Sequence, residues 1–200
     1  MRVVAGRYRG RRLAGPRGSQ TRPTSDKIRE ALFSILGDVE DARVLDLYAG
    51  TGALGIEALS RGARHATFVE RHRPTAELVR RNLAAAAGRD AGDLGSVAAC
   101  DAIAYLASAA RVGDLFDLVL IDPPYRTAES IAAGLAASLA PVLADRARVV
   151  AECDRRTPLM LESDRPGALQ GEPHNRLILV TERRYGDTLL RILETSKDTV

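Results

Sequence analysis

A glycine-rich segment, Asp46-Leu-Tyr-Ala-Gly50-Thr-Gly52-Ala-Leu-Gly55, follows a short apolar run and precedes a helical pattern. Glycines at positions 50 and 52 let the backbone turn sharply and approach a ligand without a Cβ in the way. Glu70 ends the next apolar run, where its carboxylate can accept hydrogen bonds from both hydroxyls of a ribose. The strand, glycine turn, helix and distal acid together predict a site for a cofactor that contains a nucleoside.

Two classes of cofactor satisfy this pattern. The glycine spacing matches the dinucleotide fingerprint, which supports an NAD-dependent oxidoreductase. S-adenosylmethionine also carries an adenosine, and the glycine motif does not separate it from a dinucleotide. Nothing else in the chain suggests hydride chemistry, so the choice between the two depends on a second motif.

That second motif is Asp122-Pro-Pro-Tyr125, which directly follows an apolar run over residues 115–121. Two consecutive prolines cannot continue a strand or a helix, so they hold a fixed turn. The Asp122 carboxylate and the Pro123 carbonyl can accept the hydrogens of an exocyclic base amine, on whose ring Tyr125 can stack. This arrangement directs the amine lone pair toward an incoming methyl group, and the gain comes from positioning. We therefore assign methyl transfer from S-adenosylmethionine to Asp122, Pro123, Pro124 and Tyr125, without a covalent enzyme intermediate.

Further cofactor contacts are expected where other strands end. Asp101 follows a third apolar run and can bond the adenine amino group, while the turn at Ala102 can flank the ring. Tyr48 lies inside the glycine turn, where packing on the cofactor and packing in the core are both open. The residues that we assign to the cofactor are Asp46, Tyr48, Ala49, Gly50, Thr51, Gly52, Glu70, Arg71, Asp101, Ala102 and Asp122.

The segments around these motifs alternate between strand and helix patterns. An N-terminal helix is expected to begin with Thr24 or Ser25 as its N-cap and to stop at Gly37. Such alternation predicts an α/β fold with a mostly parallel sheet, while a tight turn at residues 185–187 predicts a C-terminal antiparallel hairpin. Strands are expected over 44–48, 65–70, 97–100, 115–121, 147–153, 177–184 and 188–193, and later helices over 53–61, 74–83, 102–109 and 128–139.

Positive charge is concentrated at the N-terminus. Residues 1–30 hold nine Lys/Arg against two acids, a net +7, so the other 170 residues carry −4 of the overall +3. This asymmetry favours contact with a nucleic acid, although a solvated arm would give the same count. Residues 1–13 suit a short basic β-hairpin or an arm that orders on binding. We predict RNA contacts from Arg2, Arg7, Arg9, Arg11, Arg12, Arg17 and Arg22.

Composition excludes several other classes of protein. The chain is 46% hydrophobic and 28% charged, which is typical of a globular domain, and no apolar run is long enough to span a membrane. Its two cysteines, Cys100 and Cys153, exclude a disulfide scaffold, and no clustered His/Cys spacing suggests a metal. A cytoplasmic monomer is the default expectation.

Taken together, these motifs resemble the RsmD-type 16S rRNA (guanine-N2)-methyltransferases, a class I methyltransferase family. The resemblance covers nearly the whole chain, and only 84–96 and 154–175 match poorly. The matching stretches are AGRYRGRRL (5–13), RPTSDKIREALF (22–33), DLYAGTGALGIEALSRGA (46–63), DPPY (122–125) and ERRYGDTLL (182–190).

The resemblance implies a Rossmann-like fold with a seven-stranded sheet, S-adenosylmethionine as cofactor and methylation of a guanine N2 in 16S rRNA or the small ribosomal subunit. It implies an RNA-binding extension over residues 1–21 and a methyltransferase domain over 22–200, with Arg22 near the mouth of the pocket. The target guanine must be splayed out to reach such a pocket. Three alternatives remain: an NAD-dependent oxidoreductase, an RNA-binding module without catalysis, and a DNA or protein amino-methyltransferase with the same DPPY loop.

Overall fold

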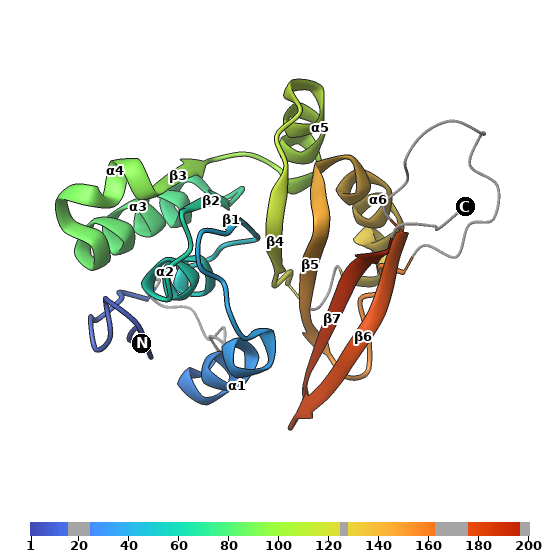
Figure 1. The fold of residues 1–200 in the computed structure, drawn as a ribbon, viewed down its shortest axis with the longest axis horizontal. Coiled ribbons are helices and arrows are strands. Elements are labelled where there is room, and N and C mark those ends of the chain that lie inside the picture. The colour runs from blue at the N-terminus through green and yellow to red at the C-terminus, as the bar shows by residue number, and fades with distance from the viewer. Residues whose placement is uncertain (16–24, 125–127, 163–175, 197–200) are drawn as a thin grey trace. The chain divides into compact units, whose positions relative to one another are not determined.

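A computed structural model describes residues 1–15, 25–124, 128–162 and 176–196, and it divides the chain into two compact units (Figure 1). The first unit is Met1–Ala102 and the second is Ile103–Val200. The domain boundary predicted between residues 21 and 22 lies outside the described residues and stays a prediction. Within these described ranges, no helix is long and apolar enough to cross a membrane.

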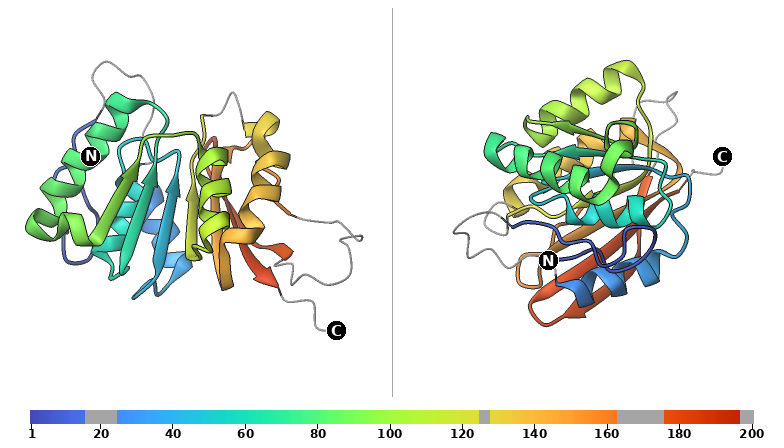
Figure 2. Two further views of the ribbon diagram at one scale, coloured as in Figure 1. Left: turned by 90° about the horizontal axis from the view of Figure 1, so that it is seen from above. Right: turned by 90° about the vertical axis from the view of Figure 1, so that its left-hand side faces the viewer.

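Three parallel strands form the sheet of the first unit in the order β3-β2-β1 (Figure 2). They are β1 (Arg43–Leu47), β2 (His65–Val69) and β3 (Gly95–Ala98). The last residues of the three strands lie in register, so their carboxyl ends share one edge of the sheet. Strands β1 and β2 are buried almost throughout, as strands covered on both faces must be.

Helices α2 (Ala53–Ser60) and α3 (Arg73–Ala87) pack on these strands, α2 against β1 and β2 and α3 against β2 and β3. Helix α3 runs four residues past the predicted end. The segment predicted to be a loop over 84–96 contains a short 3₁₀ turn, η1 (Gly88–Asp90), and α4 (Ala91–Leu94).

Helix α1 (Asp26–Leu36) confirms one of the two predicted N-caps. The Ser25 hydroxyl accepts a hydrogen bond from the Ile28 N–H at 3.2 Å, which satisfies one of the free donors of the first turn. Gly37 ends the helix with a φ of 69°, a value that a residue with a side chain adopts only at a cost.

The N-terminal segment forms part of the predicted β-hairpin, because its two arms pair in antiparallel orientation. Its only antiparallel bridge outside the named strands joins Arg2 and Arg12, within the described part of the chain. Val3, Tyr8 and Leu13 are buried, so the segment packs on the unit and is not an arm that waits for a ligand to order it. The N–H groups of Val3, Gly10 and Leu13 donate to carbonyls of the segment itself, while those of Val4, Ala5 and Tyr8 donate to side chains of α2.

The second unit holds four strands in the order β4-β5-β7-β6. Strand β4 pairs with β5 in parallel, while β7 pairs with both β5 and β6 in antiparallel orientation. This arrangement confirms the C-terminal antiparallel hairpin. The strands are β4 (Phe116–Ile121), β5 (Leu143–Asp154), β6 (Arg176–Tyr185) and β7 (Thr188–Ser196), with helices α5 (Ala102–Val112) and α6 (Ala128–Leu139) and the 3₁₀ turn η3 (Ala140–Val142).

Candidate active site

The glycine loop, residues 48–52, leaves the carboxyl end of β1 through three left-handed backbone conformations. Gly50 and Gly52 adopt φ values of 56° and 76° with no Cβ to clash. Tyr48 has φ 59°, which costs a residue with a side chain about 1–2 kcal/mol. The loop is fixed by the Ala49 N–H, which donates to the Val69 carbonyl at 3.0 Å on the neighbouring strand. A rigid turn therefore presents its backbone at the edge of the sheet, as the motif predicts.

Glu70 lies directly against this loop. Its Oε2 accepts a hydrogen bond from the Gly50 N–H at 3.2 Å, and its Oε1 accepts one from the His72 N–H at 2.7 Å. An ionised carboxylate has about four acceptor positions, so two bonds leave capacity for ligand hydroxyls. The structure thus brings together Glu70 and Gly50, which the sequence separates by 20 residues.

Asp46 is buried beneath the loop, with 1% of its surface exposed. Its Oδ2 accepts a hydrogen bond from the Gly55 N–H at 2.9 Å, at the start of α2. Burial raises the pKa of Asp46 to about 8, and the charge of Glu70 adds to the rise, while the bond from Gly55 opposes it. The carboxyl is therefore mostly protonated at neutral pH. A side chain at Gly55 would collide with Phe68, since a Cβ there would lie 2.4 Å from its ring.

The remaining cofactor candidates of the first unit surround the same edge. Asp101 and Arg71 are exposed, and Ala102 is buried where α5 begins. Burial raises the pKa of the Tyr48 hydroxyl, Asp101 raises it further, and Arg71 lowers it. The roles of Tyr48, Asp101 and Arg71 toward a cofactor stay predictions.

The DPPY motif belongs to the second unit. Asp122 follows the last residue of β4, at the carboxyl end of a strand in a parallel pair. Asp122 is partly exposed, Pro123 is buried and Pro124 is exposed, so the turn presents a carboxylate on a rigid base. Tyr125 lies outside the described residues, and its stacking role stays a prediction.

Five of the seven predicted RNA-binding arginines lie in the arginine loop, residues 1–13, which is anchored to α2. Glu57 Oε2 accepts from the Val4 N–H at 2.8 Å, and its Oε1 accepts from the Ala5 N–H at 3.0 Å. Ser60 Oγ accepts from the Tyr8 N–H at 2.9 Å. The arginine side chains face solvent on this fixed backbone: Arg2, Arg7, Arg9, Arg11 and Arg12 are exposed, whereas Arg17 and Arg22 lie outside the described residues.

Sequence reasoning missed the buried polar residues that hold these loops. Glu57, Ser60 and Asn82 are each at most 2% exposed. Arg29 is fully buried, and its Nη2 donates to the Arg2 carbonyl at 2.6 Å and to Asp26 Oδ1 at 2.7 Å. The signal was present, because each is a polar residue at a position where a helical pattern calls for an apolar one.

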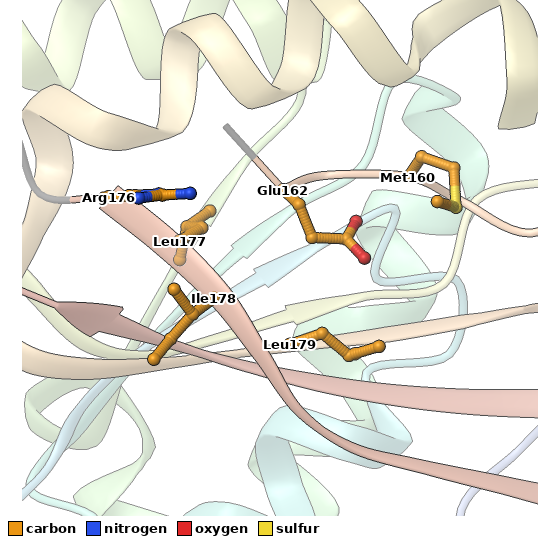
Figure 3. A pocket seen from close by; sticks show the side chains of 6 residues that line it. All are labelled: Met160, Glu162, Arg176, Leu177, Ile178 and Leu179. Carbon is orange, nitrogen blue, oxygen red and sulfur yellow. The ribbon is translucent and has the colours of Figure 1, made fainter. Parts of the chain in front are cut away.

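A hollow in the second unit contains none of the predicted site residues. The hollow has a volume of about 400 Å³. Figure 3 shows the side chains that line it: Met160, Glu162, Arg176, Leu177, Ile178 and Leu179. Glu162 accepts hydrogen bonds from the buried Arg191, and that arginine also donates to Glu182 Oε2 at 3.1 Å. Glu162 therefore stabilises the fold by pairing with the buried Arg191. Among the residues that the structure describes, no group of three or more His, Cys, Asp or Glu is placed to hold a metal.

A glycine loop and an acid at the ends of parallel strands, and a DPP turn after β4, are features that we expect of a class I methyltransferase. The solved structure of yhhF from Escherichia coli supports this class, with a TM-score of 0.77 and 29% identity over 99% of both chains. SMU.776, whose structure contains SAH, shares the fold with a TM-score of 0.63 at 16% identity, over 84% of this chain and 48% of that one.

The chain belongs to the family described as Conserved hypothetical protein 95, whose model matches residues 1–194. It is 38% identical over 160 residues to YlbH of Bacillus subtilis, which covers 80% of this chain and 85% of that protein. It is 40% identical over 127 residues to ribosomal RNA small subunit methyltransferase D of Escherichia coli, over 63% of this chain and only 61% of that relative's length. These likenesses confirm the predicted membership of an S-adenosylmethionine-dependent, rRNA-methylating family.

Proposed function

We propose that this protein transfers the methyl group of S-adenosylmethionine to the exocyclic N2 amine of a guanine in 16S rRNA. The observation that carries the proposal is the Asp122-Pro123-Pro124 turn at the carboxyl end of β4, in a chain whose first unit holds a glycine loop beside Glu70. In open α/β sheets, ligands bind outside the carboxyl ends of the strands. The likeness to ribosomal RNA small subunit methyltransferase D supports the choice of 16S rRNA.

The residues of the first unit fit the chemistry of S-adenosylmethionine. Glu70 is fixed by two backbone N–H groups and retains acceptor positions for a ribose diol. The cofactor, when bound, supplies a methyl group activated by a positively charged sulfur. The buried Asp46 carboxyl is a group whose ionised form a nearby cation would stabilise. We assign Asp101 and Ala102 to the adenine side of the cofactor.

In this proposal Asp122 and Pro123 act on the guanine. Their oxygens accept the two hydrogens of the N2 amine and orient its lone pair along the line of attack, which is catalysis by positioning. One N–C bond forms as one C–S bond breaks, and a proton leaves the amine for Asp122 or water. The chain needs no nucleophile of its own for this transfer.

The arginine loop supplies the contact to RNA. Five exposed guanidinium groups stand on a backbone that Glu57 and Ser60 anchor, so RNA binding does not require this segment to fold. Contacts to phosphates set affinity and position but read no sequence. We therefore expect the Asp122-Pro123-Pro124 turn to select the guanine.

The experiment that tests this function offers labelled S-adenosylmethionine to four acceptors: small ribosomal subunits, free 16S rRNA, DNA and protein. Label in the small subunit or its rRNA supports the proposal. Label confined to DNA or protein would assign the same loop to another amine substrate. Tighter binding of NADH than of S-adenosylhomocysteine in calorimetry would instead favour the oxidoreductase.

A further inference from the structure

Asn82 of α3 lies between the two loops that the proposed function assigns to different ligands. It is 2% exposed, and its side-chain amide makes three hydrogen bonds. Its Oδ1 accepts from the Ala14 N–H at 2.8 Å, and its Nδ2 donates to the Ala14 carbonyl at 3.0 Å and to the Thr51 carbonyl at 2.9 Å. One amide thus holds both the segment that ends the arginine loop and the tip of the glycine loop.

Thr51 also touches the other end of the arginine loop. Its Oγ1 donates to the Met1 sulfur at 3.3 Å, and the Arg29 Nη1 lies 3.9 Å from the same sulfur. Met1 therefore contacts Thr51 directly, while Ala14, which follows the arginine loop, is linked to Thr51 through Asn82. The middle of the loop is held by Glu57 and Ser60 on α2, the helix that begins directly after the glycine loop.

Because of these bonds, the position of the arginine loop depends on the position of the glycine loop. Asn82 can keep all three bonds only while Ala14 and Thr51 hold their relative positions. A ligand that reduces the remaining motion of the glycine loop therefore also reduces the motion of the arginine loop, and a second ligand then loses less conformational entropy on binding. Coupling of this kind acts equally in both directions.

We propose that Asn82 is a positioning residue that couples cofactor binding at the glycine loop to the RNA-facing arginine loop. The proposal rests on the proposed function for the identity of the ligands. It assigns Asn82 a role in neither substrate nor cofactor contact. Its effect passes through the Thr51 carbonyl and the Ala14 backbone. RNA and cofactor consequently bind with positive cooperativity.

The test is amide hydrogen exchange of peptides covering residues 1–15, with and without saturating S-adenosylhomocysteine. In the wild type we expect the ligand to slow exchange in the arginine loop by about fivefold or more, the lower end of typical coupling factors. In Asn82→Ala we expect that ratio to fall to one although the ligand still binds. A purely structural role would speed exchange in both states and leave the ratio unchanged.

Two further variants keep the test sharp. Asn82→Asp retains an acceptor for the Ala14 N–H but loses the donor to the Ala14 and Thr51 carbonyls, so we expect it to lose the response. Arg81→Ala, at the exposed neighbouring position, is the matched control and should respond like the wild type. If S-adenosylhomocysteine binds and protects the loop equally in wild type, Asn82→Ala and Asn82→Asp, the coupling is wrong and the proposed function stands. If S-adenosylhomocysteine does not bind the wild type, both are overturned.

Discussion

Asp46→Asn should make the fold more stable at neutral pH and remove part of its pH dependence. The Asp46 carboxyl has its pKa raised from 3.8 to about 8, mainly by burial. Between these values the folded protein keeps a proton that the unfolded chain has released. The folded state therefore loses stability as the pH rises through this window, and the loss stops above pH 8.

The size of this effect follows from the shift. Each pH unit inside the window costs the wild type about 1.4 kcal/mol. Raising the pH from 5 to 7 should therefore lower its free energy of unfolding by roughly 2–3 kcal/mol relative to Asp46→Asn. Asparagine mimics the protonated acid, because its Oδ1 can still accept the bond that the Gly55 N–H makes at 2.9 Å.

Urea unfolding followed by circular dichroism at pH 5, 6 and 7 measures this difference directly. The free energies of the two proteins should diverge steadily over that range, with the variant the more stable at pH 7. Asp93→Asn, which removes an exposed carboxylate of the same unit, controls for the loss of one charge. Parallel curves for wild type and Asp46→Asn would refute the reasoning.

Three further predictions follow from the same geometry. Asp122→Ala should abolish methyl transfer yet leave the Kd for S-adenosylhomocysteine within about twofold in calorimetry, and wild-type turnover would remove Asp122 from catalysis. Replacing Arg7, Arg9, Arg11 and Arg12 by alanine should weaken RNA binding and flatten its salt dependence in filter-binding titrations. An unchanged slope of affinity against salt concentration would mean that the arginine loop does not contact phosphates. Gly6→Ala should destabilise the protein by several kcal/mol in thermal unfolding. Gly6 has φ 79°, and an added Cβ would lie 1.8 Å from the Ser60 carbonyl oxygen. A change in the free energy of unfolding below about 1 kcal/mol would contradict that contact.

The sequence predicts the parts of this fold that depend on local patterns. Continuous apolar runs located β1, β2 and β4, because strands buried on both faces carry few polar residues. Ser25 and Gly37 bounded α1 through the conformations that helix ends require. The glycine loop and Glu70 were predicted together because parallel strands deliver their carboxyl ends to one edge.

Contacts between distant segments could not be predicted in the same way. The sequence predicts a hairpin for the arginine loop, but not that three of its N–H groups donate to the side chains of Glu57 and Ser60, more than 50 residues away. A polar residue on a buried helix face indicates that it has a hydrogen-bond partner. The sequence does not identify that partner, because any backbone segment can supply the donors. The same holds for Asn82, whose hydrogen bonds to Ala14 and Thr51 could not be predicted from the sequence.

The central claim is tested most directly by the chemical identity of the product. Small ribosomal subunits lacking the modification should be incubated with the protein and S-adenosylmethionine, and the nucleosides of the 16S rRNA then analysed by mass spectrometry. Our account predicts N2-methylguanosine at a single position with the wild type and none with Asp122→Ala. A methylated nucleoside other than N2-methylguanosine, or the same yield from both proteins, would contradict it.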